Sequence, residues 1–189
     1  MRTLLLTLVF LIYVSVLQAQ DDVFSNKTNI ALEKVIKDFP NRFHNIKGDV
    51  LVQQTQTIEY KSTVQVPGAT ACVVTKHTGP SNDIYTWSCS AFTSKDFNLA
   101  KNKFKEIYDQ IENTIIKVDG QKPFIVSGQY RTPYEQRKLT SVVFELLPAV
   151  GEMKNLKIEL TLQYITDWKI SLTVYDSDQK ETESTAVNN

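Results

Sequence analysis

The sequence contains few of the residues from which catalytic and metal sites are usually built. Its 189 residues include two cysteines, two histidines and six glycines. It has no G-x-S-x-G, H-E-x-x-H or phosphate-loop motif, and its glycines are too sparse for a phosphate-binding loop. Nothing near His44 or His77 has the spacing of a metal site or a catalytic triad, so ordinary surface positions are expected for both. We therefore predict no enzyme activity, no metal and no cofactor. The alternative is a glycosidase-type enzyme whose two carboxylates are distant in sequence and are brought together by the fold.

Neither basic nor acidic residues are in excess. The chain has 21 basic and 21 acidic residues, so its formal net charge is zero. A nucleic-acid-binding protein or a polybasic membrane module would have a basic excess, and we expect neither. Beyond the N-terminal segment there is no apolar run long enough to span a bilayer, so stable membrane insertion is not expected once that segment is removed.

The N-terminal segment has the features of a secretory signal peptide. Arg2 precedes an apolar run over residues 4–17, and the small Ala19 precedes a polar stretch. This pattern predicts a signal peptide over residues 1–19 and a periplasmic or secreted protein. Because Leu17 lies where cleavage sites prefer a small residue, an uncleaved anchor is the alternative. Asn26 begins an N-glycosylation sequon, which matters only in a eukaryotic secretory pathway.

The two cysteines, Cys72 and Cys89, fall within one predicted hairpin. Strand-forming residues lie on both sides of the turn-like segment 79–82. A turn centred between Pro80 and Ser81 places the cysteines directly opposite each other, at a site where Cα atoms approach to about 4.5 Å. We predict a disulfide, with two buried free thiols as the alternative. A zinc site is disfavoured because two cysteines leave the metal short of ligands.

Apolar residues recur at helical spacing in two segments. The first stripe comprises Leu32, Val35, Ile36, Phe39 and Phe43, and Pro40 should end that helix. The second helix should begin at Thr93-x-x-Asp96, which resembles a capping box. Its apolar stripe comprises Phe97, Ala100, Phe104, Ile107, Ile111 and Ile115.

Period-two alternation predicts strands in the segments 60–66, 155–164 and 168–175. Such alternation is typical of an antiparallel sheet with one buried face and one face in water. Leu160 and Leu172 should be buried. The alternation also directs Trp168 and Tyr164 inward, and it directs outward Lys157, Glu159, Lys169, Thr173 and Tyr175.

Together these patterns predict an α+β fold, with an antiparallel sheet of about seven or eight strands and two amphipathic helices on one face. One domain should cover residues 20–176, followed by a disordered tail over residues 177–189. The order of elements further predicts two related halves, 28–92 and 93–176; a chance recurrence of strand patterns is the alternative.

Each predicted half begins with a helix and ends in a hairpin whose last strand contains a tryptophan, Trp87 or Trp168. Together with the predicted hairpin disulfide, this layout resembles the tandem helix-plus-sheet repeats of the β-lactamase inhibitor protein over residues 28–176. The resemblance implies a concave sheet that is offered to a protein partner. Inhibition of a β-lactamase is not implied, because the outward positions are mostly Lys, Glu, Thr, Ser and Gln instead of aromatic and Arg anchors.

A predicted loop over residues 129–138 contains the best candidates for partner contacts. Tyr130, Arg131, Tyr134 and Arg137 crowd around Pro133, and exposed Tyr and Arg side chains are frequent in binding hot spots. An ordinary hairpin connection is the alternative. We predict an exported, soluble, non-enzymatic binding protein whose partner is a protein or a surface glycan. The runner-up is a carrier that holds a small apolar ligand between helices and sheet.

Overall fold

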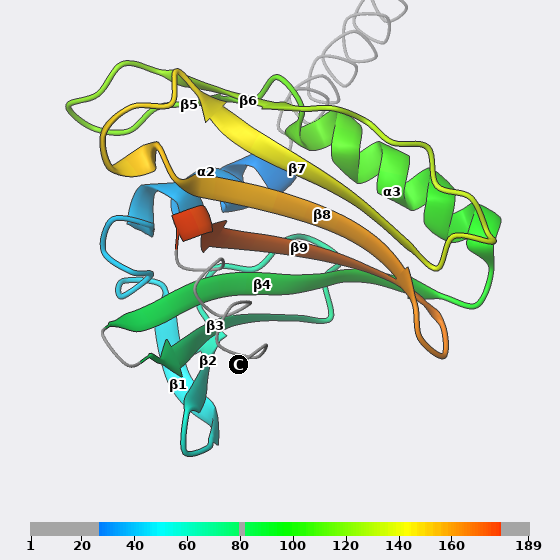
Figure 1. Ribbon diagram of the computed structural model, residues 1–189, viewed down its shortest axis with the longest axis horizontal. Coiled ribbons are helices and arrows are strands. Elements are labelled where there is room, and N and C mark those ends of the chain that lie inside the picture. Colours follow the sequence, from blue (N-terminus) through cyan, green and yellow to red (C-terminus); the bar gives the residue numbers. More distant parts are fainter. Residues whose placement is uncertain (1–26, 80–81, 179–189) are drawn as a thin grey trace, which may run out of the picture.

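The computed structural model describes residues 27–79 and 82–178. The predicted signal peptide, the Asn26 side chain and residues 179–189 of the predicted tail lie outside the described residues. Two α-helices, α2 (Lys27–Asp38) and α3 (Phe97–Ile111), pack against one open antiparallel sheet of nine strands. Figure 1 shows the strands in one twisted layer. The predicted α+β class is therefore confirmed.

The strands follow one another along the chain as two meanders, one after each helix. In the sheet they lie in the order β1-β2-β3-β4-β9-β8-β7-β6-β5. The last strands of the two meanders, β4 and β9, are therefore neighbours near the middle of the sheet. Their bounds are β1 (Lys47–Gln53), β2 (Thr57–Ser62), β3 (Ala71–Thr78), β4 (Asp83–Ser94), β5 (Ile115–Ile116), β6 (Phe124–Gly128), β7 (Leu139–Leu147), β8 (Leu156–Tyr164) and β9 (Trp168–Asp176). One short 3₁₀ helix, η1 (Gly151–Met153), lies between β7 and β8.

The count of nine strands exceeds the predicted seven or eight for two reasons. Strand β5 has only two residues, too few to show alternation. Strand β1 is an edge strand that contains the exposed apolar run Val50, Leu51 and Val52, so its burial does not alternate either.

The hairpin of β3 and β4 contains the predicted disulfide. Cys72 pairs directly with Cys89 in the ladder, their Cα atoms are 4.1 Å apart, and their sulfur atoms are bonded. Each cysteine is only 2% exposed. The disulfide and its register are thus confirmed, and Pro80 and Ser81 at the predicted turn lie outside the described residues.

Helix α2 buries Leu32, Val35 and Ile36 of the predicted stripe and ends at Asp38, two residues before Pro40; Phe39 and Phe43 lie in the turn that follows. Asp38 is only 5% exposed, and its carboxylate accepts hydrogen bonds from the backbone N–H of Asn45 at 2.9 Å and of Ile46 at 3.1 Å. These bonds fix the turn that leads from α2 into β1, and they hold Phe43 in the core at 1% exposure.

Helix α3 begins three residues later than a capping box at Thr93 would place it. Thr93 is still part of β4, and the N-cap is Asp96, whose side chain accepts a hydrogen bond from the Leu99 N–H at 3.0 Å. The prediction for Ile115 was wrong as well, because the helix ends at Ile111 and Asn113 takes a positive φ of 61°. Ile115 consequently lies in β5 and is 60% exposed.

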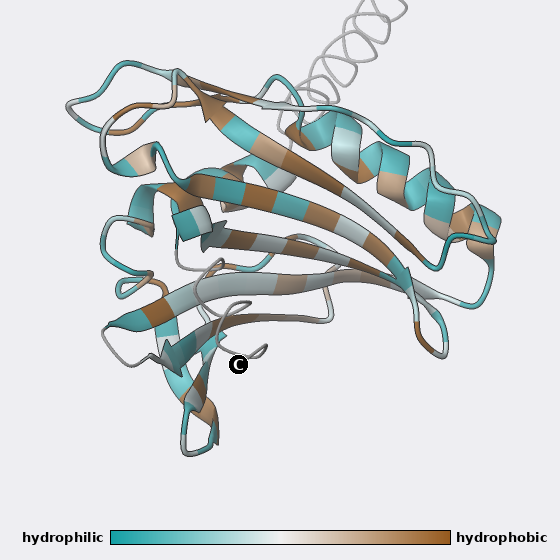
Figure 2. Ribbon diagram, in the orientation of Figure 1, coloured by the Kyte–Doolittle hydropathy of each residue, from teal (hydrophilic) through white to brown (hydrophobic). Residues whose placement is uncertain are grey.

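The predicted alternation holds along β8 and β9, and Figure 2 shows it on β8 as brown and teal bands. Leu160, Leu172 and Trp168 are buried and Lys169 is exposed, as predicted. The other three outward polar residues are only half-buried, since they pair across strands: Lys157, Glu159 and Thr173.

Two tyrosines depart from the predicted alternation. Tyr164 is 39% exposed because it lies at the end of β8, where its ring contacts the Trp168 ring at a centroid distance of 5.1 Å. Tyr175 is only 8% exposed. Its strand, β9, has a neighbouring strand on each side, so a ring on the outer face is flanked by side chains from β4 and β8.

Candidate binding cleft at strand β7

The loop 129–138 connects β6 to β7 and runs beside α3 (Figure 1). Its first aromatic residue, Tyr130, fixes the loop to that helix. The Tyr130 ring is half-buried and lies 4.8 Å from the Tyr108 ring and 6.3 Å from the Phe104 ring, measured between centroids. The Lys105 ammonium lies over the same ring at 5.4 Å from its centroid. Tyr130, predicted as a partner contact, therefore takes part in intramolecular packing.

At the end of β6, the backbone of Gly128 bonds to Tyr108 of α3 and to Glu112, the residue after that helix. The Gly128 N–H donates to Glu112 Oε2 at 2.8 Å, and its carbonyl oxygen accepts from Tyr108 Oη at 2.8 Å. A Cβ atom at this position would lie 2.6 Å from Phe144 Cδ1, so only glycine fits without a shift. Burial, followed by the nearby Glu112 carboxylate, raises the pKa of Tyr108 above its ordinary value, which keeps the phenol protonated and able to donate.

The end of β6 leaves part of β7 with a neighbour on one side only. The β6–β7 register stops at Gly128 and Phe144, whereas the β7–β8 register continues to Leu139. The Tyr164 N–H donates to the Lys138 carbonyl at 2.8 Å, so even-numbered residues of β7 bond to β8. Hydrogen bonds alternate in an antiparallel ladder. The backbone groups of Leu139 and Ser141 therefore point toward the loop, and no described strand pairs with them there.

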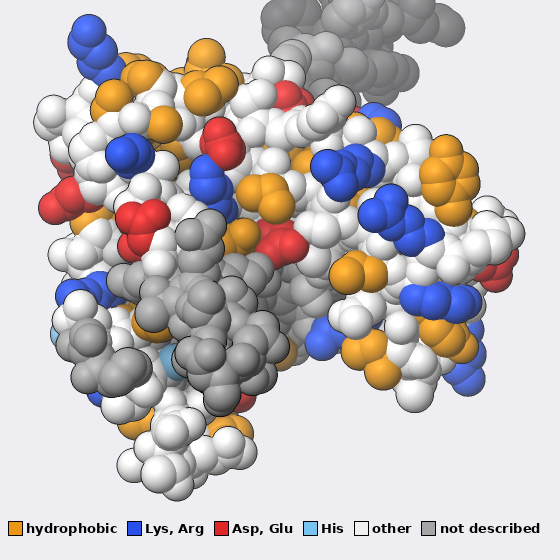
Figure 3. Space-filling model, viewed as in Figure 1, with side chains coloured by type: hydrophobic (Ala, Val, Ile, Leu, Met, Phe, Trp, Pro, Cys, Tyr) orange, Lys and Arg blue, Asp and Glu red, His pale blue; other side chains and the backbone are white. Residues whose placement is uncertain are grey.

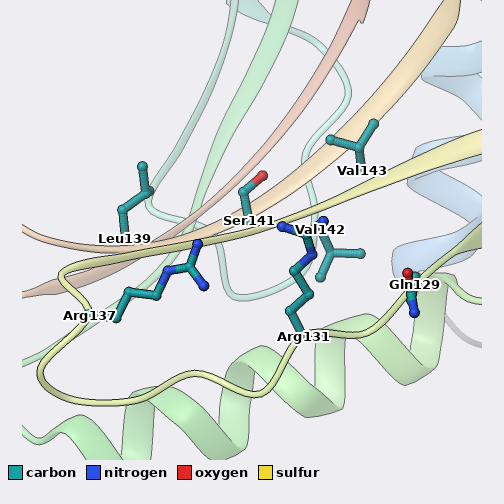
Figure 4. A pocket seen from close by; sticks show the side chains of 7 residues that line it. All are labelled: Gln129, Arg131, Arg137, Leu139, Ser141, Val142 and Val143. Atoms are coloured by element: carbon teal, nitrogen blue, oxygen red, sulfur yellow. The ribbon is translucent and has the colours of Figure 1, made fainter.

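A cleft of about 250 Å³ lies between this free edge and the loop. Figure 4 shows the side chains of Arg131 and Arg137 reaching from the loop toward β7, close to Ser141. Both arginines are exposed, and no described carboxylate forms an ion pair with either. The lining residues are Gln129, Arg131, Arg137, Leu139, Ser141, Val142 and Val143.

The cleft thus brings together two of the four predicted contact residues. Tyr134 is 61% exposed but does not line the cleft, and Tyr130 is packed on α3. Figure 3 shows further basic side chains among hydrophobic ones at the right-hand end of the molecule, where α3 and the loop lie. Positive charge is therefore not confined to the two arginines.

The groove continues along the outer face of β6 and β7. A second cleft of about 380 Å³ shares Gln129 and Val143 with the first and extends to Leu147. Its floor is partly apolar, because Val143 is 41% and Leu147 is 46% exposed. Across the strands Leu147 pairs with Ile125, and Ile125 pairs with Ile115, so an exposed apolar row extends to the edge of the sheet.

Sequence reasoning missed the β7 half of this site. Residues 139–147 have apolar side chains on both faces, since Leu139, Val143 and Leu147 alternate with the buried residues of the strand. The apolar outer face of β7, beside the polar outer face of β8, was the signal that could have found the groove. The position of the groove depends on where β6 ends, which rests on contacts with Tyr108 and Glu112 far from it in sequence.

The remaining polar candidates lie apart from the cleft. His44 is exposed in the turn after α2, and His77 lies in β3, with its Nδ1 atom 3.5 Å from Thr57 Oγ1. Among the described residues, no three His, Cys, Asp or Glu side chains are grouped as a metal site would need. A third cleft, of about 280 Å³, lies at the surface between Phe43 and Tyr85. No helix in the described part of the chain has the length and apolar content to cross a membrane.

Comparison of the chain with protein-family models, with curated proteins and with solved structures finds no match. The architectural resemblance to the β-lactamase inhibitor protein consequently stays a prediction, as do the two related halves.

Proposed function

We propose that the protein is an exported, non-enzymatic binding protein that contacts its partner through the cleft between β7 and the loop 129–138. The observation behind this proposal is the pair of exposed arginines, Arg131 and Arg137, which extend over the cleft without a described acidic partner. Arginine is enriched in interface hot spots because its planar guanidinium binds carboxylate, phosphate and sulfate groups in a bidentate manner.

The chemistry of the cleft favours a partner that has both an anionic and an apolar part. The guanidinium groups supply the positive charge, and Leu139 and Val143 supply exposed apolar surface beside them, at 49% and 41% exposure. An acidic protein segment or an acidic surface glycan has this combination of properties. Export of the mature chain to the periplasm or the cell exterior follows from the predicted signal peptide.

The alternative of an apolar-ligand carrier requires a cavity between the helices and the sheet. None of the three clefts lies there, and the large side chains in that layer, such as Phe104, Trp87 and Ile36, are fully buried. The carrier stays a prediction without an observation that favours it.

The test uses the mature chain against a random peptide library displayed on phage and against a glycan array. We expect ligands that bind the natural protein and lose binding to the double variant Arg131→Glu/Arg137→Glu. The matched control is Lys34→Glu/Lys154→Glu, which makes the same charge change at exposed positions away from the cleft. Ligands that bind both double variants equally, or no enrichment on either array, would contradict the proposal.

A further inference from the structure

The free edge of β7 suggests how a partner docks. We propose that the partner is an extended polypeptide segment that adds a strand to β7 beside Leu139–Val143, with an acidic group of the segment bound by Arg131 and Arg137. This inference rests on the proposed function, because it takes the β7 cleft as the contact surface, and it specifies the partner as a polypeptide and not a glycan.

No described strand pairs with the backbone of Leu139 and Ser141 on the cleft side of β7. An exposed strand edge offers N–H and C=O groups at alternate residues, and extended peptides bind such edges by completing the ladder. Leu139 and Ser141 present these groups toward the cleft, in the line that β6 would have followed beyond Gly128. We place the segment antiparallel to β7, in the direction that β6 has.

The side chains around that edge also favour an extended segment. A strand paired with β7 places alternate side chains on the outer face, next to Leu139, Ser141 and Val143. Because Leu139 and Val143 are exposed and apolar, the segment should have apolar residues opposite both and a smaller or polar residue opposite Ser141. Ser141 itself donates to Glu159 Oε1 at 2.6 Å, which orients its side chain away from the segment and along the sheet.

The charge at the cleft favours an acidic segment. Arg131 and Arg137 come from the loop on the far side of the cleft, so they face the segment from the side opposite to β7 (Figure 4). A side-chain carboxylate or a C-terminal carboxylate there forms charge-assisted hydrogen bonds with guanidinium groups. The cleft and its continuation, about 250 and 380 Å³, suit a segment of a few residues and not a folded domain.

The experiment measures fluorescence anisotropy with a positional-scanning set of labelled heptapeptides in which valine alternates with aspartate, glutamate, serine or lysine. We expect acidic members to bind the natural protein and lysine members not to bind. The best acidic peptide should lose at least about tenfold in affinity on Arg131→Glu/Arg137→Glu, the loss of one charge-assisted bond, and none on Lys34→Glu/Lys154→Glu.

Strand addition is tested separately by methylating alternate backbone nitrogens of the best peptide, which removes ladder donors without changing charge. One of the two methylation patterns should abolish binding, and amide NMR signals of Leu139 and Ser141 should shift on titration of the unmodified peptide. The variant Ser141→Pro, whose lost N–H faces the cleft and not β8, should also weaken binding.

The outcomes separate this inference from the proposed function. Arginine-dependent peptide binding that tolerates both methylation patterns overturns strand addition and leaves the binding function in place. Arginine-dependent glycan binding with no binding of any peptide has the same meaning. If no peptide and no glycan binds in an arginine-dependent way, both are overturned.

Discussion

Gly128 lies where β6, β7 and α3 meet, and its N–H and its carbonyl each bind a different side chain. Its N–H and carbonyl bind Glu112 and Tyr108, and its missing side chain makes room for the Phe144 ring. Replacing Gly128 with alanine should lower the free energy of unfolding by about 1–3 kcal/mol, the usual cost of overpacking. Urea denaturation of Gly128→Ala beside the neighbouring control Ser127→Ala measures this. A Gly128→Ala variant as stable as the natural protein would show that Phe144 moves aside freely.

Tyr108 should make the stability of the protein depend on pH in the alkaline range. Burial raises the pKa of its phenol in the folded state, so folding holds a proton that the unfolded chain releases. The stabilisation is therefore complete below about pH 10, the ordinary pKa of tyrosine, and is lost as the pH rises through the higher folded value. Tyr108→Phe should remove this part of the pH dependence and lower stability at neutral pH by about 1 kcal/mol through the lost hydrogen bond.

The measurement is chemical denaturation between pH 8 and 11. Tyr134→Phe is the control, because its side chain is 61% exposed and removing its hydroxyl should leave the stability at neutral pH unchanged. Equal alkaline slopes in the natural protein and in Tyr108→Phe would assign the effect to another group.

The contacts of individual side chains were the hardest feature to predict from the sequence. The residue types in the loop 129–138 drew attention to Arg131 and Arg137, which line the cleft. The same reasoning grouped them with Tyr130, because nothing local indicates that this ring packs on Tyr108. Whether an aromatic residue of the loop packs inside the protein or is free to contact a partner depends on α3, which lies earlier in the chain.

At the scale of elements, the sequence was most informative where burial follows a regular period. The stripe on α3 and the alternation on β8 and β9 each repeat several times, so one wrong position, such as Tyr164, does not obscure the pattern. Strands β1 and β5 lie at the two edges of the sheet, where burial is incomplete and no period arises. Edge strands therefore account for the difference between the predicted and observed counts.

The β3–β4 hairpin gives a prediction at this scale. The Cys72–Cys89 bond closes a loop with a sequence separation of 17, so it limits the freedom of the unfolded chain. Removing the bond should lower the free energy of unfolding by about 3 kcal/mol. Urea denaturation of the double variant Cys72→Ala/Cys89→Ala measures the loss, and the intact mass before and after reduction checks the bond in the natural protein.

A loss well below 1 kcal/mol in that variant would mean that the ladder alone holds the hairpin. The control is the natural protein unfolded with and without reductant, because reduction removes the same covalent bond without changing the side-chain volume of the core. Agreement between the two experiments separates the effect of the bond from that of the smaller alanine side chains.

At the scale of the whole molecule, the sequence predicted the layers but not the order of the strands. Alternation indicates which face of a strand is buried, and it carries no information on which strands are neighbours. The pairing of β4 with β9 joins Trp87 to Val174 and Ser94 to Trp168, with a register shift between Ser90 and Phe92, across a large separation in sequence. The two strands pair where they share the core beneath α3. No local sequence pattern predicts the pairing of strands that are so far apart in the chain.

This central position of β9 has a consequence for the order of events during synthesis. The strand made last occupies the fifth of nine places in the sheet, with β4 on one side and β8 on the other. A chain that emerges from its N-terminus can form two separate meanders, but it cannot join them until residues 168–176 have appeared. Long-range strand pairing of this kind slows folding, because the ends of a long segment must first meet. Premature termination before Trp168 would therefore remove the strand that joins the two meanders, and not a strand at the edge of the sheet.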